Sequence, residues 1–98
     1  GFEADPEGSL AVDLGVVERP SELRLNYRAR PGGAVRVELA DVPGRSLEEA
    51  APLRDDGLAA PAAWRDGTAI APSGGRRVVA RLHLDAAAVY AYELRPAG

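Results

Sequence analysis

Apolar and polar residues alternate along several stretches of this chain. The clearest stretch begins at residue 76, and its apolar positions are Val78, Ala80, Leu82 and Leu84. Because successive side chains point to opposite faces of a strand, this pattern predicts a strand with one apolar and one polar face. After a connection at residues 85–88, Tyr90, Tyr92 and Leu94 repeat the pattern. We predict that these two runs are paired strands.

The same alternation predicts three strands earlier in the chain. The first has apolar residues at Leu10, Val12, Leu14 and Val16. Two more cover residues 23–27 and 35–39, and an Arg-Pro-Gly-Gly segment separates them at residues 30–33. Glycine adopts positive φ easily, so this segment is a turn signal. We therefore predict that the second and third strands form a hairpin.

The pattern is weaker elsewhere. Residues 62–64 are predicted to form a short strand that ends at the Asp66-Gly67 turn, and residues 46–51 an extended piece with Leu47 buried. Residues 1–9 are predicted to be a linker or frayed N-terminus, which leaves residues 10–98 as a single domain. Seven to eight short strands without a helical period predict an all-β fold, an antiparallel β-sandwich or jelly roll.

Composition narrows the range of functions. A chain of 98 residues holds one domain at most, and a net charge of −3 argues against a general nucleic-acid binder. The lack of cysteine excludes disulfides and thiolate metal sites, and no apolar run approaches the roughly 18 residues of a membrane span. All 12 basic residues are arginine, which we interpret as the mark of a GC-rich bacterial genome. The absence of methionine leads us to expect a fragment of a longer protein. The cell compartment is left open.

Four segments follow one another in a recognisable order. They are Leu-Arg-Leu-Asn-Tyr at 23–27, the glycine-led strand at 32–39, Ser-Leu-Glu-Glu at 46–49 with Asp-Asp-Gly at 55–57, and Trp-Arg-Asp-Gly at 64–67 followed by 79–92. Together they resemble the small C-terminal β-sandwich domain of bacterial glycosidase-like proteins, whose catalytic domain is often a five-bladed propeller related to invertases and arabinanases. The resemblance implies a non-catalytic accessory domain that packs against, or spaces, the catalytic domain of its parent. The alternative is a carbohydrate-binding module that holds the parent on a polysaccharide.

Three aromatic residues are candidates for carbohydrate contact. Trp64, the only tryptophan, would stack on a sugar ring if it were exposed. Its two alanine neighbours suit tight packing, so we favour a core position with the indole N–H bonded to a carbonyl. Tyr90 and Tyr92 are predicted to share one strand face that Leu94 continues, which favours the core or its edge over a sugar platform.

The charged residues give no catalytic constellation. Four carboxylates bracket a loop and could supply oxygens to calcium: Glu48, Glu49, Asp55 and Asp56. Their spacing lacks the regularity of a calcium loop, so we expect solvated charges, without a metal or cofactor. His83 falls beside Arg81 and Asp85 on a polar strand face, which predicts an exposed cross-strand partner. No nucleophile motif accompanies it, so we expect no enzymatic activity from this domain alone.

Overall fold

The computed structural model describes residues 2–3 and 7–97, and the regular structure in these ranges is β. The strands are β1 (Phe2–Glu3), β2 (Glu7–Val16), β3 (Ser21–Leu39), β4 (Asp56–Pro61) and β5 (Arg77–Pro96). They form one antiparallel sheet in the order β1-β5-β3-β4, with β2 also paired to β5. The all-β antiparallel prediction is confirmed. The prediction of seven to eight short strands is wrong, because β3 and β5 are 19 and 20 residues long. No helix in the described ranges is long and apolar enough to cross a membrane.

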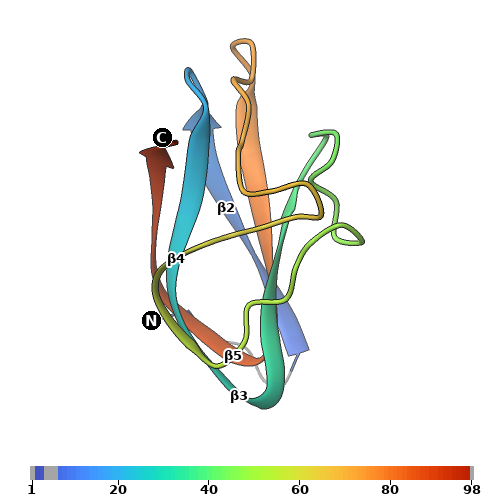
Figure 1. The fold of residues 1–98 in the computed structure, drawn as a ribbon, viewed down its shortest axis with the longest axis vertical. Helices are drawn as coiled ribbons and strands as arrows, with labels where there is room; N and C mark the ends of the chain where they lie inside the picture. The colour runs from blue at the N-terminus through green and yellow to red at the C-terminus, as the bar shows by residue number, and fades with distance from the viewer. Residues whose placement is uncertain (1, 4–6, 98) are drawn as a thin grey trace.

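The strands β3 and β5 are bent in the middle, so each contributes to two arms of the sheet (Figure 1). In the first arm, residues 77–85 of β5 lie between β2 and residues 34–39 of β3. In the second arm, residues 21–29 of β3 lie between β4 and residues 87–96 of β5. The two segments predicted to form a hairpin therefore do not pair with each other. Each pairs with a different part of β5.

Glycine at the bend lets the two long strands change direction together. Residues 30–33 of β3 lie opposite Ala86 alone in β5, and Gly32 and Ala86 have φ of 83° and 48°. A Cβ on Gly33 would lie 2.5 Å from the Asp85 carbonyl oxygen and 2.8 Å from that of Ala86. No side chain fits there. The Pro-Gly-Gly segment is thus a bend within one strand, and residues 85–88 likewise continue β5 where a connection was predicted.

Both arms contribute to one hydrophobic core. The predicted alternation is confirmed in β5, where Val78, Ala80, Leu82 and Leu84 are all buried. Leu25, Val37 and Leu82, from the predicted apolar faces, are 0%, 2% and 1% exposed and belong to the same cluster. The inner face was therefore assigned correctly from sequence for residues 23–27, 35–39 and 78–84, but Val16 of the first predicted strand is 39% exposed, beyond the register shift between Asp13 and Gly15, and the strand pairing was wrong.

The connections between strands depart from prediction in two places. Residues 62–64 do not form a strand, because Trp64 makes only isolated bridges, with Ala50 and Gly67. Leu47 is 37% exposed, contrary to its predicted burial, since a turn closed by the Ala50 N–H and the Leu47 carbonyl oxygen lifts this segment from the core. The Asp66-Gly67 turn is present, with reciprocal backbone hydrogen bonds of 2.8 and 3.0 Å between Trp64 and Gly67.

The N-terminal residues predicted as a linker are partly in the sheet. Phe2 and Glu3 pair with Val89 and Ala88, and β2 begins at Glu7 rather than at residue 10. The rest of the predicted linker, residues 1 and 4–6, lies outside the described residues.

Candidate functional site

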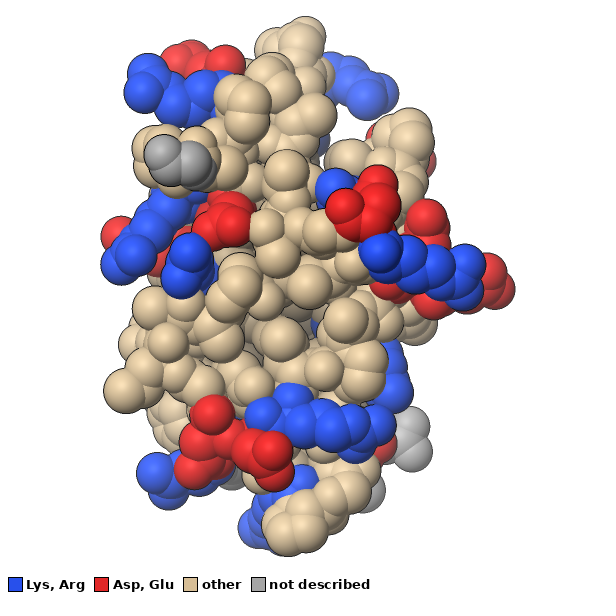
Figure 2. All heavy atoms as spheres, in the orientation of Figure 1, with Lys and Arg blue, Asp and Glu red and all other residues tan. Residues whose placement is uncertain are grey.

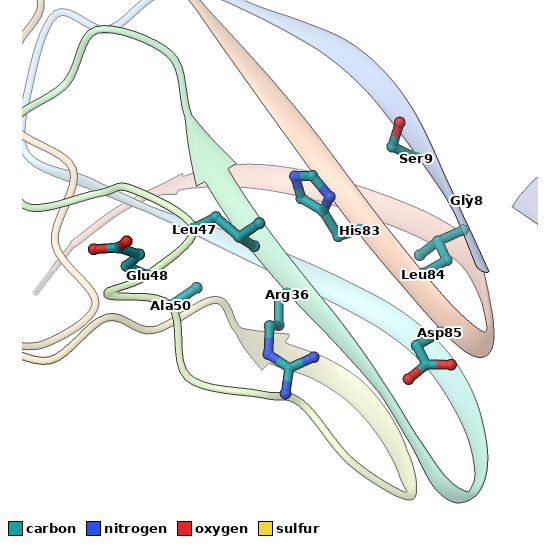
Figure 3. A pocket seen from close by; sticks show the side chains of 9 residues that line it. All are labelled: Gly8, Ser9, Arg36, Leu47, Glu48, Ala50, His83, Leu84 and Asp85. Atoms are coloured by element: carbon teal, nitrogen blue, oxygen red, sulfur yellow. The ribbon is translucent and has the colours of Figure 1, made fainter.

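A polar groove of about 710 Å³ lies on the outer face of the first arm (Figure 3). Its hydrogen-bonding side chains are Ser9, Arg36, Glu48, His83 and Asp85. Three of these residues form one row across the sheet, because Ser9 of β2 and Arg36 of β3 both pair with His83 of β5. Alternation along each strand places all three on the face opposite the core. The 46–51 connection completes the groove with Glu48, Leu47 and Ala50.

Cross-strand contacts fix two of the groove side chains. His83 Nε2 lies 3.0 Å from Glu38 Oε1, and both side chains are about one-third exposed. His83 is thus a cross-strand partner, as predicted, but its side chain is half-buried rather than exposed. Arg81 donates to the Ser9 hydroxyl over 3.3 Å. Because the Ser9 hydroxyl contacts Arg81 and the imidazole contacts Glu38, the groove shows no serine–histidine hydrogen bond of the kind that activates a nucleophile. Its chemistry suits binding of a polar molecule.

Trp64 is buried at 3% exposure, and its Nε1 donates to the Val37 carbonyl oxygen over 2.9 Å. The guanidinium of Arg45 lies 4.9 Å from the ring centroid, a cation–π contact. Arg45 also donates to the Ala69 carbonyl oxygen through Nε and Nη2. These contacts confirm the core interpretation of Trp64. They leave no face of the indole free to stack on a sugar.

Tyr90 and Tyr92 are 53% and 42% exposed, so the predicted position in the core or at its edge is wrong for Tyr90, and Tyr92 lies at the edge. The ladder pairs Ala91 with Asn26 and Val89 with Tyr27, which leaves Tyr90 unpaired in a bulge. A bulge breaks the alternation, so the two tyrosines do not share one regular strand face as predicted. Tyr92 pairs with the buried Leu25 and lies on the core side of β5, at the sheet edge. Neither tyrosine, nor Trp64, lines the polar groove.

The four loop carboxylates do not converge on a metal site. Glu49 Oε1 accepts from the Ser46 hydroxyl over 2.7 Å, and Asp56 lies 3.7 Å from Arg28. Within residues 2–3 and 7–97, no three metal-ligating side chains come together. The hypothesis that Glu48, Glu49, Asp55 and Asp56 bind calcium therefore has no geometric support.

A second, apolar groove of about 500 Å³ lies between residues 40–43 and 71–79. Its apolar lining includes Val42, Pro43, Pro72, Val78 and Val79. Val79 is 37% exposed, on the outer side of β5. Asp41, Arg76 and Arg77 also line this groove and supply charge of both signs.

Charge is mixed on the face that Figure 2 shows. Arginine side chains lie beside acidic ones toward the sides of the molecule, and uncharged atoms fill the middle except near the bottom of the view, where acidic and arginine side chains cross it. Among the described residues seen in this view, no extended positive surface of the kind that binds nucleic acid is present.

Among the side chains that the structure describes, three have shifted pKa values, and all three lie outside the polar groove. A hydrogen bond from Arg77, with another from the Gly15 N–H, lowers the pKa of Asp13. Hydrogen bonds from Thr68 and Arg24 lower the pKa of Glu22. Burial raises the pKa of Tyr27, and the charges of Asp55 and Asp56 add to that effect. All three shifts arise from contacts within the sheet and its connections.

No protein-family model, no curated protein and no solved structure matches this chain.

Proposed function

We propose that this chain is a non-catalytic accessory domain of a glycoside hydrolase-like protein, and that it packs against the catalytic domain of that parent. The link to glycoside hydrolases rests on the four ordered segments that resemble the C-terminal β-sandwich domain of such proteins. A β-sandwich arrangement is supported by the core that the two arms of the bent sheet share.

The observation that carries the packing role is the apolar groove. It gathers valine and proline side chains from two loops and the start of β5 at one end of the molecule. Exposed apolar surface rimmed by polar residues is typical of interaction sites. Asp41, Arg76 and Arg77 would select a partner surface that carries charge of both signs.

Hydrogen exchange tests the packing role. Backbone amides at residues 40–43 and 71–79 should exchange more slowly in the parent protein than in the isolated 98-residue chain, because a docked partner excludes water. Amides around the polar groove at residues 36 and 83 serve as the internal reference. Equal exchange of the apolar groove in both proteins would contradict the proposal.

A matched pair of variants adds a second test. Val79 and Arg81 lie on the same outer face of β5, two residues apart, but only Val79 lines the apolar groove. Val79→Glu should restore fast exchange at residues 40–43 in the parent, and Arg81→Glu should not. If both variants or neither restore it, the groove is not the docking surface.

The second candidate function is carbohydrate binding, and the polar groove favours it. A guanidinium, an imidazole, a hydroxyl and two carboxylates line that groove and offer donors and acceptors for sugar hydroxyls. Titration of the isolated chain with soluble oligosaccharides, followed by amide NMR shifts, tests this function. Shifts centred on Arg36 and His83, absent in Arg36→Ala, would support it, and an unchanged spectrum across a broad oligosaccharide panel would exclude it.

A further inference from the structure

Arg36, in the polar groove, differs from the other arginines of the chain. All 12 arginines lie in the described ranges, and three of them are not exposed: Arg24, Arg36 and Arg45. Arg24 is ion-paired with Glu22, and Arg45 is ion-paired with Asp66. No hydrogen bond or ion pair joins the guanidinium of Arg36 to another described residue. Arg36 is thus a half-buried arginine whose donors are unused within the described part of the chain.

The guanidinium of Arg36 is open to the groove. Among the described side chains that are not exposed, every nitrogen or oxygen hidden from solvent has a hydrogen-bond partner. Because Arg36 has no such partner, its guanidinium nitrogens all remain accessible to solvent and to a ligand. The planar guanidinium donates two parallel hydrogen bonds to a carboxylate. A carboxylate in the groove is therefore the ligand group that Arg36 fits best.

The groove also presents hydrogen-bond acceptors on both sides of Arg36. β5 flanks this part of β3 on one side, and the 46–51 connection lies on the other. Asp85 comes from β5 and Glu48 from the connection, and in Figure 3 the guanidinium lies between their carboxylates. Neither carboxylate is ion-paired with a described residue. Both can accept hydrogen bonds from ligand hydroxyls.

His83 and Ser9 add one acceptor and one donor. A carboxylate only accepts, so His83 Nε2 carries the proton in its contact with Glu38, and Nδ1 of the neutral ring keeps its lone pair. The Ser9 hydroxyl accepts from Arg81 and keeps its own proton for donation. The row beside Arg36 thus suits a ligand with several hydroxyl groups.

We propose that the polar groove binds a hexuronate residue of an acidic polysaccharide, with the sugar carboxylate on Arg36 and the sugar hydroxyls on the neighbouring polar groups. The uronate specificity rests on the second candidate function, carbohydrate binding, and names its substrate class. Leu47, which is 37% exposed in the groove wall, contacts the C–H groups of the sugar ring.

The charge balance of the groove favours a sugar acid over other anions. One free guanidinium faces the carboxylates of Glu48 and Asp85, so a multiply charged ligand such as a phosphate meets repulsion from both. A hexuronate brings a single negative charge together with hydroxyl donors for these carboxylates. An acidic peptide brings its carboxylates without hydroxyls.

Esterification of the ligand tests the role of the carboxylate. The 98-residue chain is titrated with a galacturonate trimer and, separately, with the methyl ester of that trimer, and amide NMR shifts are followed. The two ligands share their rings and hydroxyls. The acid should shift amides centred on Arg36 and His83, and the ester should bind at least about tenfold more weakly, because it lacks the charge-assisted hydrogen bonds.

A matched pair of variants tests Arg36 itself. Arg36→Gln should weaken binding of the acid trimer at least about tenfold and should affect the ester less. Arg77→Gln removes the same charge from an exposed position on the outer face of the first arm, outside the polar groove, and should stay within about threefold of the wild type. Amide spectra of both variants should match the wild type away from the substituted residue, which verifies the fold.

The possible failures separate the two levels of the proposal. If the ester binds as tightly as the acid, or if neutral maltotriose shifts the groove amides and the acid trimer does not, carbohydrate binding stands and the uronate specificity falls. An equal loss in Arg36→Gln and Arg77→Gln also overturns the specificity, because general charge attraction would then explain the binding. A triglutamate peptide that binds as tightly as the acid trimer would make the groove a site for acidic peptides. If no oligosaccharide binds, both the specificity and the second candidate function fall.

Discussion

The first and second arms are made from the same two strands, yet β5 is buried in one and open in the other. In the first arm β5 has β2 on one side and β3 on the other, and Leu82 and Leu84 are 1% and 2% exposed. In the second arm no described strand pairs with β5 beyond Val89 on the side away from β3, and Tyr92 is 42% exposed although it pairs with the buried Leu25. Alternation therefore decides which face a side chain is on, and the neighbouring strands decide whether that face is covered.

The largest contrast should appear between the buried and the exposed aromatic residues. Trp64→Ala should cost roughly 3–5 kcal/mol of unfolding free energy, because it removes a buried ring, its hydrogen bond to Val37 and its contact with Arg45. Tyr90→Ala, in the open second arm, should stay within about 0.5 kcal/mol. Urea melts of both variants check this. Similar losses would show that the bulge at Tyr90 packs as tightly as the core.

A second contrast compares two leucines of β5. Leu82→Ala in the covered first arm should cost roughly 2–5 kcal/mol, as should Leu25→Ala in the shared core. Leu94→Ala, at the partly buried edge, should cost about 1 kcal/mol. Thermal and urea melts at a concentration where the chain is monomeric give these values. A loss at Leu94 equal to that at Leu82 would mean that the second arm is covered in solution.

The bend between the arms can be probed by two adjacent glycines. Gly33→Ala would place a methyl group against the carbonyl oxygens of Asp85 and Ala86, and should reach the upper end of the roughly 1–3 kcal/mol that overpacking costs. Gly32→Ala meets nothing within 4 Å and carries only the strain of φ 83°, about 1 kcal/mol. Equal losses in urea melts would show that the strands separate easily at the bend.

The smallest effect concerns stability in acid, to which one carboxylate in each arm contributes. The folded pKa values of Asp13 in β2 and Glu22 in β3 are lowered, so their stabilising contributions are present above the ordinary values of 3.8 and 4.5 and are lost as pH falls through the lowered values. Asp13→Asn and Glu22→Gln should each make the unfolding free energy less dependent on pH in this acidic range. Thr68→Val should reproduce part of the Glu22→Gln effect, since the Thr68 hydrogen bond is the largest cause of that shift and the contribution of Arg24 remains. An unchanged pH profile would contradict the assignment.

The sequence predicted strand faces well and strand partners poorly. The alternation of residues 23–27, 35–39 and 78–84 identified the core because burial follows the strand period. The Pro-Gly-Gly segment was misassigned as a hairpin turn because glycine also permits a bend in a continuous strand. The close contact of Gly33 with Asp85 and Ala86 distinguishes a bend in a continuous strand from a hairpin turn. That contact joins residues far apart in sequence, so the local pattern does not show it.

The candidate surfaces were harder to predict than the fold class. The sequence placed His83 on a polar face and gave it a cross-strand partner, which Glu38 proves to be. It did not identify the polar groove, because Ser9, Arg36 and His83 become neighbours only once β2 and β3 are known to flank β5. The exposure of Tyr90 was missed for a local reason. A single unpaired residue in β5 shifts the alternation, and nothing in the residue pattern marks where that residue lies.

The bent ladder between β3 and β5 also determines how this chain folds. Even its closest pair in sequence, Leu39 with Ala80, is separated by the whole of β4 and both long connections. The chain must therefore close a long loop before any β3–β5 residue pair can contribute to stability. Chains dominated by such distant contacts fold on the slow timescale of milliseconds to seconds. In the native register Gly33 lies against the carbonyl oxygens of Asp85 and Ala86, so both strands bend at the same point. A larger side chain at position 33 would therefore disfavour the native pairing of β3 with β5.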